Sequence, residues 1–239
     1  MQSIGSTCPA KDLTEEAVLK SPTAQVGYSE KAYTHLRESI LSGELRPGYP
    51  ISELESCEAL KMSRTPVREA IHRLIAEGVL VRLRGRGTFV RSLSRDEICS
   101  VYEYAEGLEG MVAFLVAQKY DSKFERRILE PIEAMEAQIE KSTGSGMNET
   151  DWSAADWRFH DSLYEICPNR IIVEGLKRVY AQIELVRLGV SGVLLNRRKS
   201  TQDHRQTATA IIAGDAYGAR VTMQRHWERI RTDLMKGMA

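Results

Sequence analysis

The chain has 239 residues, with 42% hydrophobic and 28% charged side chains and a formal net charge of zero. This mixture is typical of a folded globular protein and excludes fibrous and disordered classes, and the length suits two ordinary domains. The sequence has no apolar run near the roughly 20 residues of a membrane span, no secretory signal and no C-x-x-C pair among its four cysteines. We therefore expect a cytoplasmic protein with reduced thiols and no membrane association.

The N-terminal part of the chain predicts a tail followed by three helices and a β-hairpin. Residues 1–26 are polar and show no sustained periodicity, which predicts a flexible tail. Apolar residues at spacings of three and four begin after Ser29, and Ser52 followed by Glu55 is a capping-box pattern. The predicted elements are a helix over 29–41, a short helix over 52–60, a helix from 63 to about 78, and hairpin strands at 79–83 and 88–90.

A basic segment covers the third helix and the hairpin. Residues 61–91 contain eight basic and two acidic side chains, whereas residues 95–239 contain 20 basic and 22 acidic ones. A basic segment on an otherwise neutral chain is typical of a nucleic-acid-binding module. Within it, Arg64 and Arg68 lie one turn apart and opposite an apolar helix face, which favours readout of guanine in the major groove. For an arginine pair alone, a solvated helix face is the alternative.

The segment from residue 63 to residue 90 has the sequence S-R-T-P-V-R-E-A-I-H-R-L-I-A-E-G-V-L-V-R-L-R-G-R-G-T-F-V. It closely resembles the winged helix-turn-helix of GntR-family regulators, and the resemblance spans about residues 29–91. Two positions depart from the family pattern, since Leu54 stands where an arginine often contacts DNA and Lys61 replaces the usual glycine of the turn. The resemblance implies a DNA-binding domain over 27–92 that contacts an operator through Ser63, Arg64, Thr65, Arg68, Arg84, Gly85 and Arg86.

Beyond Arg95 the strand signals disappear and helical periodicity continues to the end of the chain. A Gly/Ser-rich loop at 142–146 and further glycines and a proline separate the helical stretches. We therefore predict a mainly α protein whose second half is an all-α bundle of about six helices. The predicted helices cover residues 95–119, 123–141, 151–165, 170–189, 199–213 and 215–236.

One carboxylate and three imidazoles in this half form a candidate metal site. Asp156 and His160 are four residues apart and share a helix face, while His204 and His226 fall on two later helices. Facing one bundle interior, these groups would suit zinc best, with nickel, manganese or iron as alternatives. Each histidine taken singly fits a surface or hydrogen-bonded core position better than a ligand position.

Four short motifs, D-W-R-F-H, D-H-R-Q, A-I-I-A-G-D-A-x-x-A-R and R-H-W, are similar to the C-terminal ligand-binding (FCD) domain of the FadR subfamily of GntR regulators. The resemblance implies an effector domain over 93–239 that holds a divalent metal on Asp156, His160, His204 and His226. Six helices in this domain resemble the VanR-type branch of the subfamily.

Relatives in this subfamily usually bind carboxylate-bearing metabolites through the metal and a nearby arginine. Ala105 stands where many of them carry that arginine, so the ligand class of this chain is open. A solvent-facing or helix-capping role is the alternative for each of the substitutes that we consider, which are Tyr102, Arg158, Asn169 and Arg187.

The sequence therefore predicts a DNA-binding regulator and no enzymatic activity. By the resemblance, we expect a homodimer that represses at a palindromic operator and is released by a small organic acid bound near the metal. A metal sensor is the first alternative, and a purely structural metal is another. A metal-dependent enzyme is disfavoured because no H-E-x-x-H or comparable motif supplies a general base.

Overall fold

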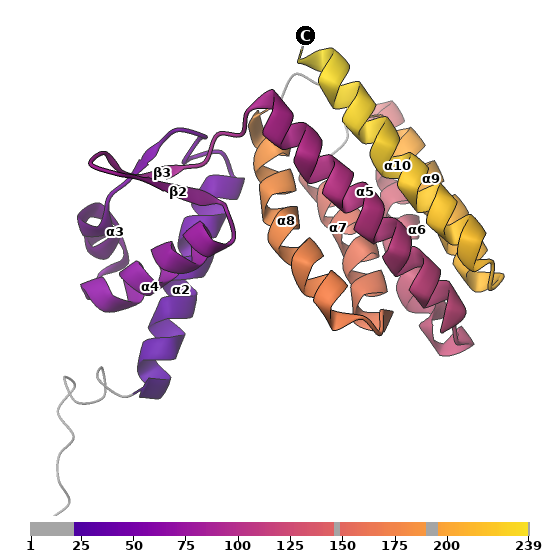
Figure 1. Cartoon of the computed structure of the whole chain (residues 1–239), viewed down its shortest axis with the longest axis horizontal. Helices are drawn as coiled ribbons and strands as arrows, with labels where there is room; N and C mark the ends of the chain where they lie inside the picture. The colour runs from indigo at the N-terminus through magenta and orange to yellow at the C-terminus, as the bar shows by residue number, and fades with distance from the viewer. Residues whose placement is uncertain (1–21, 146–148, 190–195, 239) are drawn as a thin grey trace, which may run out of the picture. The chain divides into compact units, whose positions relative to one another are not determined.

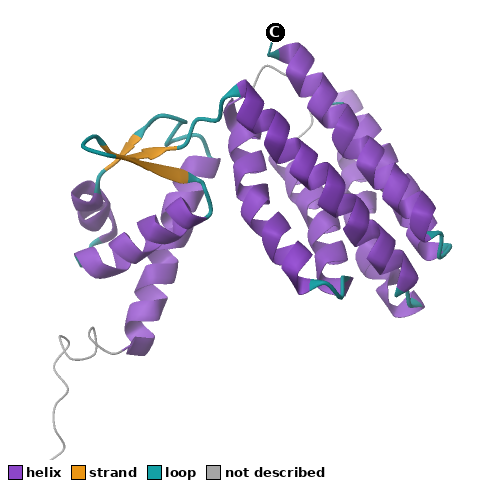
Figure 2. Cartoon of the chain, viewed as in Figure 1, coloured by secondary structure: helices purple, strands orange, loops and turns teal. Residues whose placement is uncertain are grey.

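Residues 22–145, 149–189 and 196–238 are described by the computed structural model, and their contacts divide the chain into two units. The first unit comprises the chain up to Ala76 together with Leu80–Val90, and the second comprises Glu77–Val79 and the chain from Arg91 onward. Figure 1 shows the two units along the chain, and Figure 2 shows that strands occur in the first of them. No helix among the described residues is long and apolar enough to cross a membrane.

The first unit contains the three helices and the hairpin that the sequence predicts. Its first helix begins at Pro22 and not at Ser29, because proline is well tolerated in the first turn of a helix. The predicted tail over 1–26 thus overlaps this helix, and residues 1–21 lie outside the described residues. The elements are α2 (Pro22–Leu41), β1 (Pro50–Ile51), α3 (Glu53–Leu60), α4 (Arg64–Ala76), β2 (Leu80–Leu83) and β3 (Gly87–Val90).

A three-stranded antiparallel sheet in the order β1-β3-β2 forms the wing of this unit (Figure 2). The hairpin pairs Leu80 with Val90 and Leu83 with Gly87. Strand β1 was not predicted, because two residues carry no readable alternation, and its Pro50 is acceptable since the strand lies at the sheet edge.

Helix α4 is fixed by its apolar face. Val67, Ile71 and Leu74 are fully buried and lie at spacings of three and four residues. This face packs against α2, whose Leu36 and Ile40 are also buried. The opposite face of α4 is therefore left toward solvent.

Lys61 ends α3 with φ 52° and ψ 44°, in the left-handed region that favours glycine. Any residue with a Cβ atom is strained in this conformation, which lowers the free energy of unfolding by roughly 1–2 kcal/mol. Glycine avoids this strain but lowers the free energy of unfolding by about 0.4–1 kcal/mol, because its unfolded backbone has more conformational entropy to lose. We expect Lys61→Gly to raise the free energy of unfolding by up to about 1 kcal/mol, as measured by urea denaturation of the full chain. The matched variant Lys61→Val should lower it, because a β-branched side chain is worse still at positive φ. A glycine variant less stable than wild type would contradict this account.

The second unit is an all-α bundle, as predicted, with six α-helices and one short 3₁₀ turn among the described residues (Figure 1). Each predicted helix is present, with ends that differ by a few residues. The elements are α5 (Arg95–Gln118), η1 (Ser122–Phe124), α6 (Glu125–Ser145), α7 (Glu149–Ile166), α8 (Arg170–Gly189), α9 (Arg197–Ile212) and α10 (Ala216–Gly237).

Helix α5 is the central element of this bundle. It begins at a capping box in which Ser94 accepts a hydrogen bond from the Glu97 backbone and the Glu97 side chain bonds back to Ser94. Its most extensive contact is with α10, and it also contacts α7, α8 and α9. The buried positions on its inner face alternate at spacings of four and three and are Ile98, Tyr102, Ala105, Glu109, Val112 and Val116.

Candidate DNA-binding surface and metal centre

The exposed face of α4 carries the residues predicted to contact DNA. Arg64, Thr65 and Arg68 are exposed on this helix, and Ser63 is exposed immediately before its first residue. Because the other face of α4 is buried against α2, these side chains are held on a rigid element. Such an arrangement suits insertion of the helix into the major groove.

Arg68 is already paired in the free protein. Its Nε and Nη2 atoms lie 3.3 and 3.2 Å from the Glu53 Oε2 atom of α3, and Arg82 lies 3.9 Å from the other oxygen. Since these side chains are partly exposed, the pair contributes little stability. Glu53 instead holds the Arg68 guanidinium through Nε and Nη2 in a defined orientation.

The turn between β2 and β3 supplies the remaining predicted DNA contacts. Arg84, Gly85 and Arg86 are all exposed at this tip. Gly85 has φ 73°, a conformation that side chains rarely adopt, so the tight turn requires glycine there. Two arginines on a short, fixed turn suit contacts with phosphates or the minor groove.

Three histidines from different helices meet inside the second unit. His160 of α7, His204 of α9 and His226 of α10 are completely buried, and one ring nitrogen from each lies within 4.8 Å of the others. Their ring centroids are 4.3 Å apart for the His204–His226 pair and 5.0 Å apart for the His160–His204 pair. We call these three residues the histidine cluster.

Buried ring nitrogens in this cluster lack hydrogen-bond partners. Both nitrogens of His160, both of His226 and Nδ1 of His204 have none among the described residues. Leaving such groups unsatisfied in a protein interior is costly, and it is rare in native structures. These ring nitrogens have lone pairs that no hydrogen bond uses. Together with the nitrogen-rich donor set, they fit a divalent ion such as zinc, and also nickel, manganese or iron.

Asp156 joins the cluster one helical turn before His160. Its Oδ1 atom lies 2.8 Å from His204 Nε2, and its Oδ2 atom accepts a hydrogen bond of 2.9 Å from Arg187 Nη2. Burial alone raises the pKa of Asp156, but Arg187 and His204 outweigh it and hold that pKa well below its ordinary value. Asp156 is therefore an anion at neutral pH, as a metal-binding carboxylate must be.

The protonation of two histidines also suits a metal. Burial, reinforced by the neighbouring His204, lowers the pKa of His226 to about 3. Burial likewise lowers the pKa of His204, against the opposing effect of Asp156. For His160 burial lowers the pKa too, but the Glu109 carboxylate outweighs it and the pKa is raised. His204 and His226 are thus neutral at pH 7, the form in which imidazole binds metals.

The structure divides the four candidate effector residues into two pairs. Tyr102 is completely buried and Arg187 is partly buried, with Arg187 bonded to Asp156 and also 3.5 Å from the Tyr180 hydroxyl. The Tyr102 hydroxyl has no hydrogen-bond partner among the described residues. Arg158 and Asn169 are exposed and are not brought to the cluster. Asn169 instead accepts a hydrogen bond from the Ile172 backbone at the start of α8.

Two buried carboxylates beside the cluster were missed by the sequence analysis. Glu109 of α5 lies 3.2 Å from His160, and Asp203 of α9 lies 3.5 Å from His226. The available signal for Glu109 was its position, since a charged residue occupied a place in the apolar four-three spacing of α5. Asp203 had only its place next to His204 as a signal.

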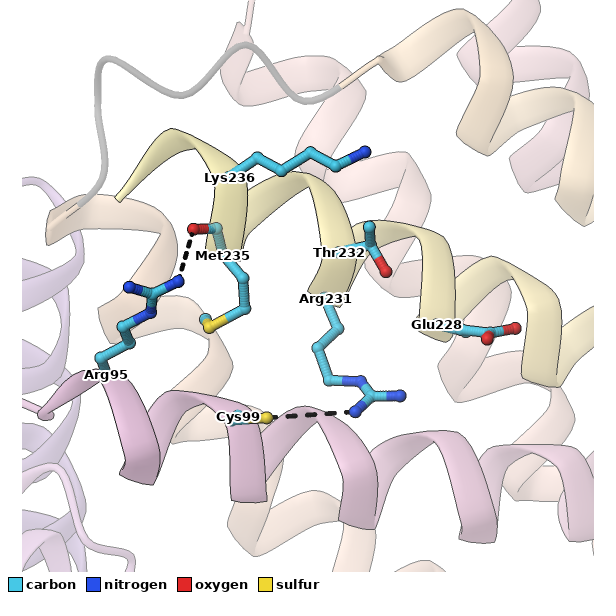
Figure 3. Close-up of a pocket in the computed structure, with 7 residues that line it drawn as sticks. All are labelled: Arg95, Cys99, Glu228, Arg231, Thr232, Met235 and Lys236. Atoms are coloured by element: carbon cyan, nitrogen blue, oxygen red, sulfur yellow. Dashed lines mark hydrogen bonds between the residues drawn. The ribbon is translucent and has the colours of Figure 1, made fainter. Parts of the chain in front are cut away.

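A separate cavity of about 390 Å³ lies at the start of α5 and the end of α10 (Figure 3). Arg95 donates a hydrogen bond to the Met235 carbonyl there, and Arg231 points toward Cys99. Arg231 is held by Glu103 and Glu106, so its charge is already neutralised. No member of the histidine cluster lines this cavity.

Two family models match the two parts of the chain. Residues 28–90 match the model of the gntR family of bacterial regulatory proteins, and residues 100–229, more than half of the chain, match the FCD domain.

Individual relatives resemble the chain over most of its length. An uncharacterised HTH-type transcriptional regulator of Agrobacterium vitis is 34% identical over 158 residues, which are 64% of this chain and 88% of that protein. A protein of Paenarthrobacter nicotinovorans described as a probable D-xylose utilization operon transcriptional repressor is 28% identical over 78% of this chain and 80% of its own length. Among solved structures, Escherichia coli McbR/YncC superposes with a TM-score of 0.74 at 18% identity, covering 89% of this chain and 99% of that one.

These matches are to DNA-binding transcriptional regulators and not to enzymes. The paired matches also give the order of domains, with the DNA-binding part first and the FCD domain second. The chain belongs to the GntR family of bacterial regulatory proteins, with an FCD domain as its C-terminal half.

Proposed function

We propose that this regulator is a repressor that a small carboxylate-bearing metabolite releases from its operator. The observation that carries the proposal is Arg187, a largely buried guanidinium beside the histidine cluster. Its Nε atom and the Tyr102 hydroxyl are buried without partners among the described residues. A carboxylate placed between them would satisfy both groups, because guanidinium and hydroxyl are the donors that such an anion needs.

A divalent metal would be held by Asp156, His160, His204 and His226. When bound, it supplies positive charge that attracts an anionic ligand. Arg187 of α8 already donates a hydrogen bond to Oδ2 of Asp156 on α7, and Asp156 in turn contacts His204 on α9. A second carboxylate bound beside Arg187 would therefore change the net charge where these three helices meet. This point is where ligand binding would alter helix packing.

In this proposal the protein binds DNA as a homodimer, with one DNA-binding domain from each chain. A homodimer places two copies of α4 on the half-sites of a palindromic operator, about one helical turn of DNA apart. The effector weakens binding only to the extent that it prefers the conformation that cannot span both half-sites. The name of the Paenarthrobacter relative, a repressor, supports this direction of control.

The test measures operator affinity by fluorescence anisotropy, with a DNA fragment that carries the promoter of the operon encoding this protein. Zinc-loaded protein is titrated with small mono- and dicarboxylates, and their methyl esters serve as controls. For the cognate acid we expect operator affinity to fall by roughly 5- to 150-fold, a usual range for allosteric coupling. Arg187→Met should remove most of this response, whereas the matched variant Arg158→Met, at an exposed position on α7, should keep it.

Other outcomes separate the alternatives. A rise in operator affinity with the acid would contradict release as the direction of control. A graded response to zinc alone, without any acid, would indicate a metal sensor. An acid response that survives Asp156→Ala, with only thermal stability lowered, would indicate a purely structural metal.

A further inference from the structure

We propose that Glu109 and Asp203 are positioning residues that orient two histidines of the cluster so that Nε2 of each ring faces the metal. The inference rests on the metal site of the proposed function. It assigns a role to two buried carboxylates that are not themselves ligands, and it names the ligating nitrogen of His160 and of His226.

Glu109 lies against the Nδ1 side of His160. Its Oε1 atom is 3.2 Å from that nitrogen, and both side chains are almost completely buried. The Tyr164 hydroxyl donates a hydrogen bond to the same Glu109 oxygen, which fixes the carboxylate from the other side. Glu109 therefore faces Nδ1 of the His160 ring at ion-pair distance, although neither ring nitrogen makes a hydrogen bond among the described residues. The Nε2 atom is buried and has no carboxylate facing it in the same way.

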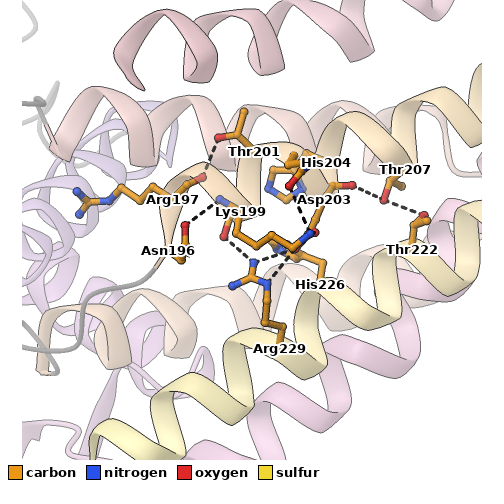
Figure 4. A network of polar contacts seen from close by, with 12 residues as sticks. Asn196, Arg197, Lys199, Thr201, Asp203, His204, Thr207, Thr222, His226 and Arg229 are labelled. Carbon is orange, nitrogen blue, oxygen red and sulfur yellow. Dashed lines mark hydrogen bonds and ion pairs between the residues drawn. The ribbon is translucent and has the colours of Figure 1, made fainter. Parts of the chain in front are cut away.

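Asp203 stands in the same relation to His226. Its Oδ2 atom is 3.5 Å from His226 Nδ1. Two cations hold the carboxylate, because Arg229 donates from Nε and Nη2 at 3.0 and 2.9 Å and Lys199 lies 3.0 Å from the other oxygen (Figure 4). Neither nitrogen of His226 makes a hydrogen bond among the described residues, and it is Nδ1 that the Asp203 carboxylate faces, which leaves Nε2 buried on the other side of the ring.

The two pairs share one geometry although they come from different helices. In each, a carboxylate from a neighbouring helix faces Nδ1 and leaves Nε2 for the centre of the cluster. Histidine ligands of metals generally present their second nitrogen to such an acceptor, which fixes the ring and makes the ligating nitrogen more basic. His204 differs, because its Nε2 faces Asp156, which the proposed function makes a ligand.

The test compares zinc affinity, measured by competition with a chromogenic chelator, between wild type and the variants Glu109→Gln and Asp203→Asn. Each variant should bind zinc about 10- to 100-fold more weakly, the usual effect of losing an outer carboxylate. The visible absorption of the cobalt-substituted proteins should also shift, since it reports the geometry of the ligands. The matched control is Asp161→Asn, next to His160 in sequence but paired with Lys177 at 3.2 Å, and it should keep wild-type affinity.

A measurement on the wild type makes the test independent of how the variants fold. In the zinc-loaded protein with ¹⁵N-labelled histidine, nuclear magnetic resonance should show the proton of His160 and of His226 on Nδ1. A proton on Nε2 of either ring, or variants whose zinc affinity stays within twofold of wild type, would overturn the positioning role while the metal site stands. A wild-type protein that binds no zinc would overturn both.

Discussion

Replacing Arg64 and Arg68 together with alanine is expected to weaken operator binding by at least about 30-fold. Each arginine that reads a base through two hydrogen bonds contributes roughly 1–3 kcal/mol to the binding free energy. The double variant removes both arginines from the exposed face of α4. The fold should survive, because neither side chain belongs to the buried face formed by Val67 and Ile71. Anisotropy at one fixed salt concentration measures the change, since phosphate contacts make affinity salt-dependent.

The control for this prediction is the pair Arg126→Ala and Arg127→Ala. These residues are exposed on α6, so the double variant removes the same charge from the other unit. It should change operator affinity by less than about twofold. An equal loss in both double variants would mean that net charge, and not the face of α4, determines DNA binding.

Replacing His204 with alanine is expected to abolish metal binding and the stability that the metal adds. His204 has the closest ring contact in the histidine cluster and also bonds Asp156. A ligand at 1,000 times its dissociation constant stabilises a fold by about 4 kcal/mol. Addition of zinc should therefore raise the melting temperature of chelator-treated wild type by several degrees, and it should leave that of His204→Ala unchanged.

Elemental analysis after gel filtration provides the second readout of this experiment. Wild type should carry about one zinc per chain, and His204→Ala almost none. The control His35→Ala removes a histidine that is exposed on α2, so it should behave as wild type does. A His204→Ala protein that keeps its zinc would remove this residue from the proposed ligand set.

The elements of the fold could be predicted because their signals are local. Each helix of the bundle carries its own apolar periodicity, and the hairpin has glycines where positive φ is needed, as at Gly85. Strand β1 could not be predicted, since its two residues become a strand only by pairing with β3.

The candidate site was predicted only in part, because packing decides the rest. Asp156 and His160 share a helix face by spacing alone, but the choice among the four effector candidates depends on how the helices rotate against one another. That rotation turns Arg187 inward, to 2.9 Å from Asp156, and leaves Arg158 exposed. Glu109 escaped notice because its partner His160 is on another helix and distant in sequence.

The histidine cluster takes His226 from the last helix of the bundle and lies against Glu109 from the first, and this has a consequence for protein synthesis. Glu109 leaves the ribosome early, whereas His226 on α10 follows only when translation is almost finished. Since α10 also covers α5, a chain that stops before α10 exposes the apolar side of α5 and lacks one of the three histidines. We expect such a truncated product to keep the DNA-binding unit without the complete histidine cluster, and its uncovered helix should make it sensitive to proteases.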